Sequence, residues 1–197
     1  SRLIHNGLYS DDTDISDNLI NLYVNQGVAI AAKNNYKEAI QLDGIGYINN
    51  SFYTTYKGIS VVSDEENLWT LPLPQIPIAI GRNEGISRLL FKNSQNNLSF
   101  DAIPLPANQL AFTRSMRPIP NKILYYSEGG DAKVITALNM TEYKASVTMI
   151  SGGDYTNMNS TINLPDDAIP AVIDYVMKLL VSELKMKADN SNDGVST

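Results

Sequence analysis

The densest cluster of acidic side chains, Asp11, Asp12, Asp14 and Asp17, is the first place to look for metal chemistry. Closely spaced carboxylates supply the oxygen ligands that Ca²⁺ prefers, but a helix–loop–helix calcium site also needs a central glycine and a closing bidentate glutamate. This segment has neither residue in place. We therefore interpret the four carboxylates as the acidic start of a helix, where the helix dipole stabilises negative charge.

The chain contains few of the residue types that nucleophilic catalysis requires. There is no cysteine and a single histidine, His5, so disulfides, thiolate metal sites and cysteine nucleophiles are excluded. A serine–histidine triad or a histidine metal site would have to use His5, which we interpret as a terminal polar residue. The phosphate-loop and Gly-x-Ser-x-Gly patterns are both absent. The sequence thus predicts a protein that is not an enzyme and that binds no cofactor or metal.

The charge pattern bears on the class of partner. The formal net charge is −6, and the 15 Lys and Arg residues are scattered along the chain without forming a run. Sequence-specific binding to nucleic acid normally requires a basic footprint, which is missing. No apolar run approaches the ~20 residues that span a bilayer, so we also expect no membrane partner.

Aromatic side chains are frequent in the first half of the chain, with Tyr47, Phe52, Tyr53, Tyr56 and Trp69 close together in sequence. Such residues can stack on sugars, and they also dominate protein cores and subunit interfaces. The first interpretation keeps a carbohydrate- or receptor-binding module of a tail or surface assembly open as an alternative function. The second leads to a subunit that functions through its contacts.

Two helices are predicted, over residues 12–42 and 165–187. In the first, apolar residues recur at helical spacing from Ile15, and Asp43-Gly44 forms a stop signal. Gly27 either interrupts this helix, so that a second helix begins after it, or lies within one continuous helix. In the second, Pro165 and the acids that follow it form a start signal, and an amphipathic stripe runs from Ile169 to Leu184.

Residues 45–150 are predicted to form an antiparallel β region. Strand candidates include Leu68–Pro72, Ile86–Phe91 and Tyr143–Ile150, and Gly129-Gly130 marks a hairpin. Because neither helix can bury its apolar stripe alone, we expect an α+β fold in which the N- and C-terminal helices pack together with the β region inserted between them. Residues 1–187 would form a single domain, followed by a flexible tail over 188–197.

Two proline-braced segments are the predicted interaction sites, since proline fixes an extended backbone that lacks an amide donor. The candidate contact residues are Pro72, Pro74, Pro77, Arg114, Arg117, Pro118 and Pro120. The two arginines are either ordinary surface charges or contacts to the carboxylates of a neighbouring subunit.

Three passages carry a resemblance to a known family: "DISDNLINLYVNQGVAIAAKNNY", "VVSDEENLWTLPLPQIPIAI" and "INLPDDAIPAVIDYVMKLLVSELKMKADNSND". Their order resembles the head-to-tail adaptor, or ring, proteins of short-tailed bacteriophages, especially crAss-like and related Bacteroidetes phages. Residues 86–150 do not align with that family.

The resemblance implies a virion structural protein at the portal–tail junction, assembled in the host cytoplasm. It would form a homo-oligomeric ring of twelve copies. Its partners would be the portal protein and other tail or ring proteins, with genomic DNA passing through the lumen without sequence-specific binding.

Overall fold

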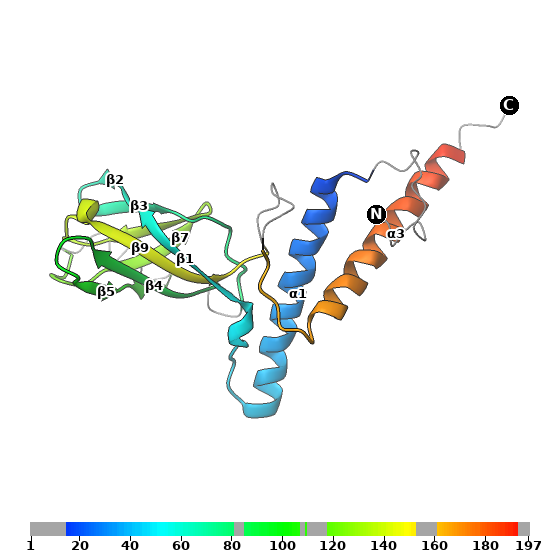
Figure 1. Cartoon of the computed structure of the whole chain (residues 1–197), viewed down its shortest axis with the longest axis horizontal. Helices are drawn as coiled ribbons and strands as arrows, with labels where there is room; N and C mark the ends of the chain where they lie inside the picture. The colour runs from blue at the N-terminus through cyan, green and yellow to red at the C-terminus, as the bar shows by residue number, and fades with distance from the viewer. Residues whose placement is uncertain (1–14, 81–84, 107–108, 110–117, 153–160, 193–197) are drawn as a thin grey trace. The chain divides into compact units, whose positions relative to one another are not determined.

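The computed structural model describes residues 15–80, 85–106, 109, 118–152 and 161–192, with side chains up to residue 185. The chain divides into two compact units, shown in Figure 1. The helical unit comprises Ser1–Phe52 and Gly152–Thr197, and the β unit comprises Tyr53–Ser151. The described residues contain two α-helices and two β-sheets, which confirms the predicted α+β class.

Helix α1 spans Asp17–Asp43 and begins later than the predicted residue 12. The reason is a specific cap: the side chain of Ser16 accepts a hydrogen bond from the backbone N–H of Leu19, which satisfies one of the unpaired donors at the helix start. The helix continues through Gly27 without a break. It ends as predicted, because Gly44 adopts a left-handed conformation with φ of 70° and donates its N–H to the carbonyl of Ile40.

Helix α3 spans Ile169–Asn192, so it begins and ends later than the predicted 165–187. Pro165 belongs to a turn before the helix, in which Ala168 N–H donates to the Pro165 carbonyl. At the other end, the helix formers Met186, Lys187 and Ala188 carry the helix past residue 187. Helix α3 thus extends to residue 192, into the range 188–197 predicted as a flexible tail, and residues 193–197 lie outside the described part.

The two helices touch within the helical unit. The hydroxyl of Tyr23 on α1 donates a 2.7 Å hydrogen bond to Glu183 on α3. Gly27 lies so close to α3 that a methyl group in its place would be 2.9 Å from Cγ1 of Val172. The buried residues of α3 at helical spacing are Val172, Val176 and Leu180.

The β unit contains two sheets, named here sheet A and sheet B. Sheet A has the strand order β1-β9-β4-β5 and is antiparallel throughout. Its strands are β1 (Tyr53–Ser60), β4 (Ile86–Asn93), β5 (Ser99–Asp101) and β9 (Tyr143–Ile150). Sheet B has the order β2-β3-β8-β7-β6. Its strands are β2 (Val62–Glu65), β3 (Leu68–Pro72), β6 (Ile103–Pro104), β7 (Leu124–Glu128) and β8 (Asp131–Ile135). Short 3-10 turns lie at Asn50–Phe52 and Met140–Glu142.

One strand pair corrects the predicted antiparallel region. Strand β6 runs parallel to β7, with Ile103 opposite Leu124 and Pro104 opposite Tyr125. Parallel neighbours cannot be joined by a tight hairpin turn, and β6 and β7 are separated by residues 105–123 in the sequence. The predicted hairpin is confirmed: Gly129 and Gly130 connect β7 to β8 and both have positive φ.

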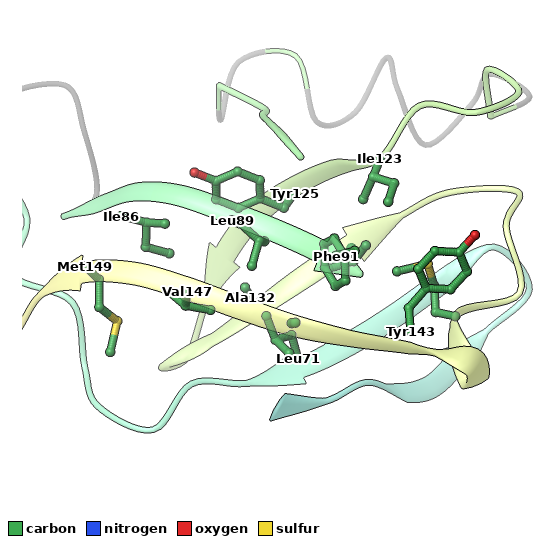
Figure 2. Packing of buried hydrophobic residues seen from close by; sticks show 13 residues of the cluster. Leu71, Ile86, Leu89, Phe91, Ile123, Tyr125, Ala132, Tyr143, Val147 and Met149 are labelled. Carbon is green, nitrogen blue, oxygen red and sulfur yellow. The ribbon is translucent and has the colours of Figure 1, made fainter. Parts of the chain in front are cut away.

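A single apolar core lies between the two sheets (Figure 2). Strand β9 shows how the sheets build it, because alternate residues of a strand point to opposite faces. Its buried inward residues are Tyr143, Ala145, Val147 and Met149, which meet Leu89 and Phe91 of β4 and Leu71, Tyr125, Ala132 and Val134 of sheet B. Lys144, Ser146 and Thr148, which lie between them, face outward, and Ile150 at the end of the strand is buried.

Candidate interaction surfaces

The first proline segment, residues 72–77, leaves sheet B and then joins sheet A. Pro72 is the last residue of β3 and pairs with Asp131, and Pro74 is exposed while Pro77 is half-buried. Beyond the prolines, Ile78 N–H donates a 2.9 Å hydrogen bond to the carbonyl of Ile150 on β9. The segment is thus anchored at both ends, and it presents Ile76 to solvent.

Gly85 completes this anchor. Gly85 has a φ of 76°, and its carbonyl accepts a hydrogen bond from the N–H of Ile150. The backbone of Ile78 lies so close to its Cα that no side chain would fit there. Residues 78, 85 and 150 therefore form a close backbone junction at the end of sheet A. Only glycine fits at position 85.

The second proline segment is described in part. Arg114 and Arg117 lie outside the described residues, Pro118 is half-buried and Pro120 is exposed. Between the two prolines, Ile119 is exposed, and its carbonyl accepts the N–H of Lys122 in a turn where Asn121 has positive φ. The interaction roles predicted for these prolines and arginines stay predictions.

A group of exposed apolar side chains lies at the C-terminal end of α1, and the sequence patterns did not single it out. Its members are Ile40, Leu42, Ile45 and Tyr47, which we call the α1 tip. Leu42 is 83% exposed and Ile45 is 70% exposed, unusually high for aliphatic side chains. The sequence predicts residue 40 within the first helix and residues 45 and 47 within the β region. The available signal was the apolar residues that lie, between polar residues and glycines, on both sides of Gly44.

The α1 tip is held in one shape by contacts along the helix. Beyond Gly44, the chain turns back so that Gly46 packs directly on the ring of Tyr36. Three residues later, the N–H of Asn49 donates a 2.9 Å hydrogen bond to the side chain of Asn35. A hydrogen bond with Asp43 raises the pKa of the Tyr47 hydroxyl, so that side chain is also tied to the helix end. Ile40 and Leu42 are therefore presented on the last turn of α1, and Ile45 on the loop that is held against the helix.

The aromatic cluster considered for sugar stacking is largely used elsewhere. Tyr56 and Trp69 are partly buried against the core of the β unit, and the Tyr56 hydroxyl shares a 3.1 Å hydrogen bond with Ser151. Phe52 is buried, and burial also raises the pKa of Tyr53. Of these five aromatic residues, Tyr47 at the α1 tip is the exposed one. This distribution favours the role of core and interface residues over a stacking platform.

Metal and membrane chemistry gain no support from the described part of the chain. Within it, no three His, Cys, Asp or Glu side chains gather as a metal site would require. Of the acidic cluster, Asp17 is the exposed first residue of α1, while Asp11, Asp12 and Asp14, like His5, lie outside the described residues. A search of the described helices for one long and apolar enough to cross a bilayer finds none.

Comparison of the sequence with models of known protein families and with curated proteins finds no match.

Proposed function

We propose that this protein is a structural subunit of a larger assembly and that the α1 tip is one of its contact surfaces. The observation that carries the proposal is the ordered display of Leu42 and Ile45 to solvent. Exposed apolar groups that gather on a fixed surface are typical of protein interfaces. Because the loop is held by Gly44, Gly46 and Asn49, little conformational entropy is lost when a partner covers it.

The free energy gained by burying these side chains is large enough for them to anchor an interface. Fully burying one large aliphatic side chain contributes about 1.5–3 kcal/mol. Leu42 and Ile45 are the two most exposed aliphatic residues of the described chain, so they have the most to gain from a partner. Tyr47 adds an aromatic group, and tyrosine is enriched in interfaces.

For the assembly itself we propose a ring at the portal–tail junction of a short-tailed phage, through which DNA passes. The resemblance of the three quoted passages to head-to-tail adaptor proteins supports this identity, and the net charge of −6 suits a surface that does not grip DNA. The neighbours would be further copies of the chain, the portal protein and other tail proteins.

Within the subunit, we propose that α1 and α3 pack together, as the apolar stripes of the sequence predict. The Tyr23–Glu183 hydrogen bond and the close approach of Gly27 to Val172 support this pairing. Gly27 permits the helices to approach at this point because it has no side chain.

Replacing Gly27 by leucine is expected to weaken the helical unit. Leucine improves helix propensity by about 1 kcal/mol, but its side chain would be forced against Val172 and Tyr175, and overpacking costs roughly 1–3 kcal/mol. Thermal unfolding followed by circular dichroism at 222 nm checks the result. Asn34→Leu, at an exposed position of the same helix, is the control and should be neutral or stabilising. Equal stability of both variants would argue against the helix pairing.

The double variant Leu42→Asp/Ile45→Asp tests the assembly role. We expect the wild-type chain to form oligomers in native mass spectrometry and light scattering, and the variant to dissociate at least about a hundredfold more readily, because two buried aliphatic groups would become buried charges. Circular dichroism should be unchanged, since both side chains are exposed in the single chain.

The matched control is Val62→Asp/Leu98→Asp, which places the same charges at exposed apolar positions of the β unit. Its oligomers should persist. A wild-type chain that stays monomeric and binds no portal or tail component would contradict the proposed function. If instead the control and the α1 tip variant dissociate alike, the tip has no special role.

A further inference from the structure

The fold separates the charges of the β unit between its two sheets. The strands of sheet A contain four basic residues, Lys57, Arg88, Lys92 and Lys144, and one acidic residue, Asp101. The strands of sheet B contain one basic residue, Lys133, and four acidic residues, Asp64, Glu65, Glu128 and Asp131. The two sheets share one core, so their outward faces lie on opposite sides of it.

The strand register places the basic residues of sheet A on its outward face. On β9, the core takes Tyr143, Ala145 and Val147, so Lys144, Ser146 and Thr148 point outward. Cross-strand partners share a face. Lys92 is opposite Lys144, Lys57 is opposite Ser146 and Arg88 is opposite Thr148. All four basic residues are exposed.

One of these cations already has an acidic partner. Arg88 forms a two-pronged ion pair with Asp101, at 2.6 and 3.0 Å, and this pair raises the pKa of the guanidinium and lowers that of the carboxyl. Lys144 donates to the hydroxyl of Ser60, which carries no charge. Lys92 and Lys144 are cross-strand neighbours of like charge, and like charges directly opposite each other destabilise a sheet.

Sheet B shows the opposite distribution of charge. Lys133 forms an ion pair with Asp64 at 2.7 Å, and this ion pair, together with a hydrogen bond from Thr70, lowers the pKa of the Asp64 carboxyl. At the end of the neighbouring hairpin, Glu128 lies directly opposite Asp131 on the same face. Glu128 is exposed and Asp131 is half-buried. Glu128 and Asp131 thus form an acidic pair on sheet B, and Lys133, whose pKa is raised by Asp64 and also by Glu128, is the basic residue near it.

We propose that the outward face of sheet A docks onto the Glu128–Asp131 hairpin of sheet B in a second copy of the chain. Each copy would relieve the like-charge pair of its neighbour through Lys92 and Lys144 on one side and Glu128 and Asp131 on the other. Two different surfaces meet in such a contact, so it is head-to-tail, and head-to-tail contacts close into rings when the rotation allows. The inference rests on the proposed function as an assembly subunit and adds the surfaces that set subunit orientation.

Charge complementarity decides between the candidate occupants of sheet A. A nucleic acid would offer phosphates to Lys92 and Lys144, but Arg88 on the same face is already paired with Asp101, which leaves few cations to neutralise a polyanion. A second copy presents its acidic hairpin on an equally fixed scaffold. Electrostatic contacts of this kind chiefly set orientation and partner choice.

Exchanging the charges of one pair at a time tests the contact. We expect Lys92→Glu/Lys144→Glu and Glu128→Lys/Asp131→Lys each to self-associate about tenfold or more weakly than wild type in sedimentation velocity at about 50 mM NaCl, where screening is weak. Mixed in equal amounts, the two variants should recover association, because each supplies the surface that the other has lost. Wild-type association should weaken as salt is raised.

Lys33→Glu/Lys37→Glu is the control, since it makes the same change in charge at exposed positions of α1 and should leave association intact. A mixture that stays as weak as its components overturns the proposal. So does duplex DNA binding that is lost in Lys92→Glu/Lys144→Glu alone, which would make a polyanion the occupant of sheet A.

Failure of this inference is distinguishable from failure of the proposed function. If the α1 tip variant dissociates while all charge variants assemble like wild type at every salt concentration, the sheet contact is wrong and the assembly role stands. If the wild-type chain stays monomeric and binds no portal or tail component, both are wrong.

Discussion

Replacing Gly85 by alanine is expected to lower the free energy of unfolding of the β unit by about 3 kcal/mol or more. Two causes act together. A side chain at a φ of 76° costs about 1–2 kcal/mol by itself, and the new methyl group would overlap the backbone carbonyl of Ile78. Backbone cannot move aside as a flexible side chain can. Relief of the clash would break the hydrogen bonds from Ile78 and Ile150 that tie the first proline segment to sheet A.

Gly58→Ala is the matched control, because Gly58 has almost the same φ, 78°, and nothing within 4 Å of the position of the added methyl. It should cost only about 1–2 kcal/mol. Urea unfolding followed by tryptophan fluorescence measures both, since Trp69 is the only tryptophan of the chain and lies on β3 of the same unit. Equal losses for the two variants would mean that the backbone junction contributes nothing.

Truncation of Phe91 to alanine is the second substitution with a large expected effect. Phe91 is completely buried at 0% exposure and lies in the core between the two sheets (Figure 2). Removing its ring leaves a cavity as well as losing apolar burial, which together cost about 3–5 kcal/mol. The midpoint of urea unfolding, again read from Trp69 fluorescence, should fall by a corresponding amount.

Leu98→Ala provides the comparison for this truncation. Leu98 precedes β5 and is 53% exposed, and its hydrogen bonds to Asn93 and Asn96 involve only its backbone. Its replacement should cost less than about 1 kcal/mol. If Phe91→Ala were as mild as Leu98→Ala, the shared core of the two sheets would not be what stabilises the β unit.

The two proposed contacts would divide the work of assembly between them. The α1 tip would supply apolar burial through Leu42 and Ile45, which is nearly insensitive to salt. The faces of sheets A and B would supply orientation through charge, which is sensitive to salt. Assembly by an apolar anchor and a charged guide would make a chain with scattered charges specific for its neighbours.

Local signals in the sequence were enough to predict several elements. The end of α1 at Gly44 and the hairpin at Gly129-Gly130 follow from the backbone freedom of glycine, which acts where it stands. The strands β3 and β9 follow from their β-branched and aromatic residues. The start of α1 was missed because Ser16 and the acids before it are all acceptable near a helix start, and only the geometry of the cap distinguishes them.

What the sequence by itself determined is thus an α+β class in which a β region lies between two helices in the sequence. The sequence also has no cysteine and no pattern of a known catalytic site. The tertiary structure decided which residues meet. Lys92 and Lys144 are far apart in the chain and become neighbours only through the β4–β9 pairing, so the scattered charges of the sequence become a basic face. The parallel pairing of β6 with β7 and the exposure of the α1 tip have the same physical reason, because both depend on long-range packing that local preferences do not encode.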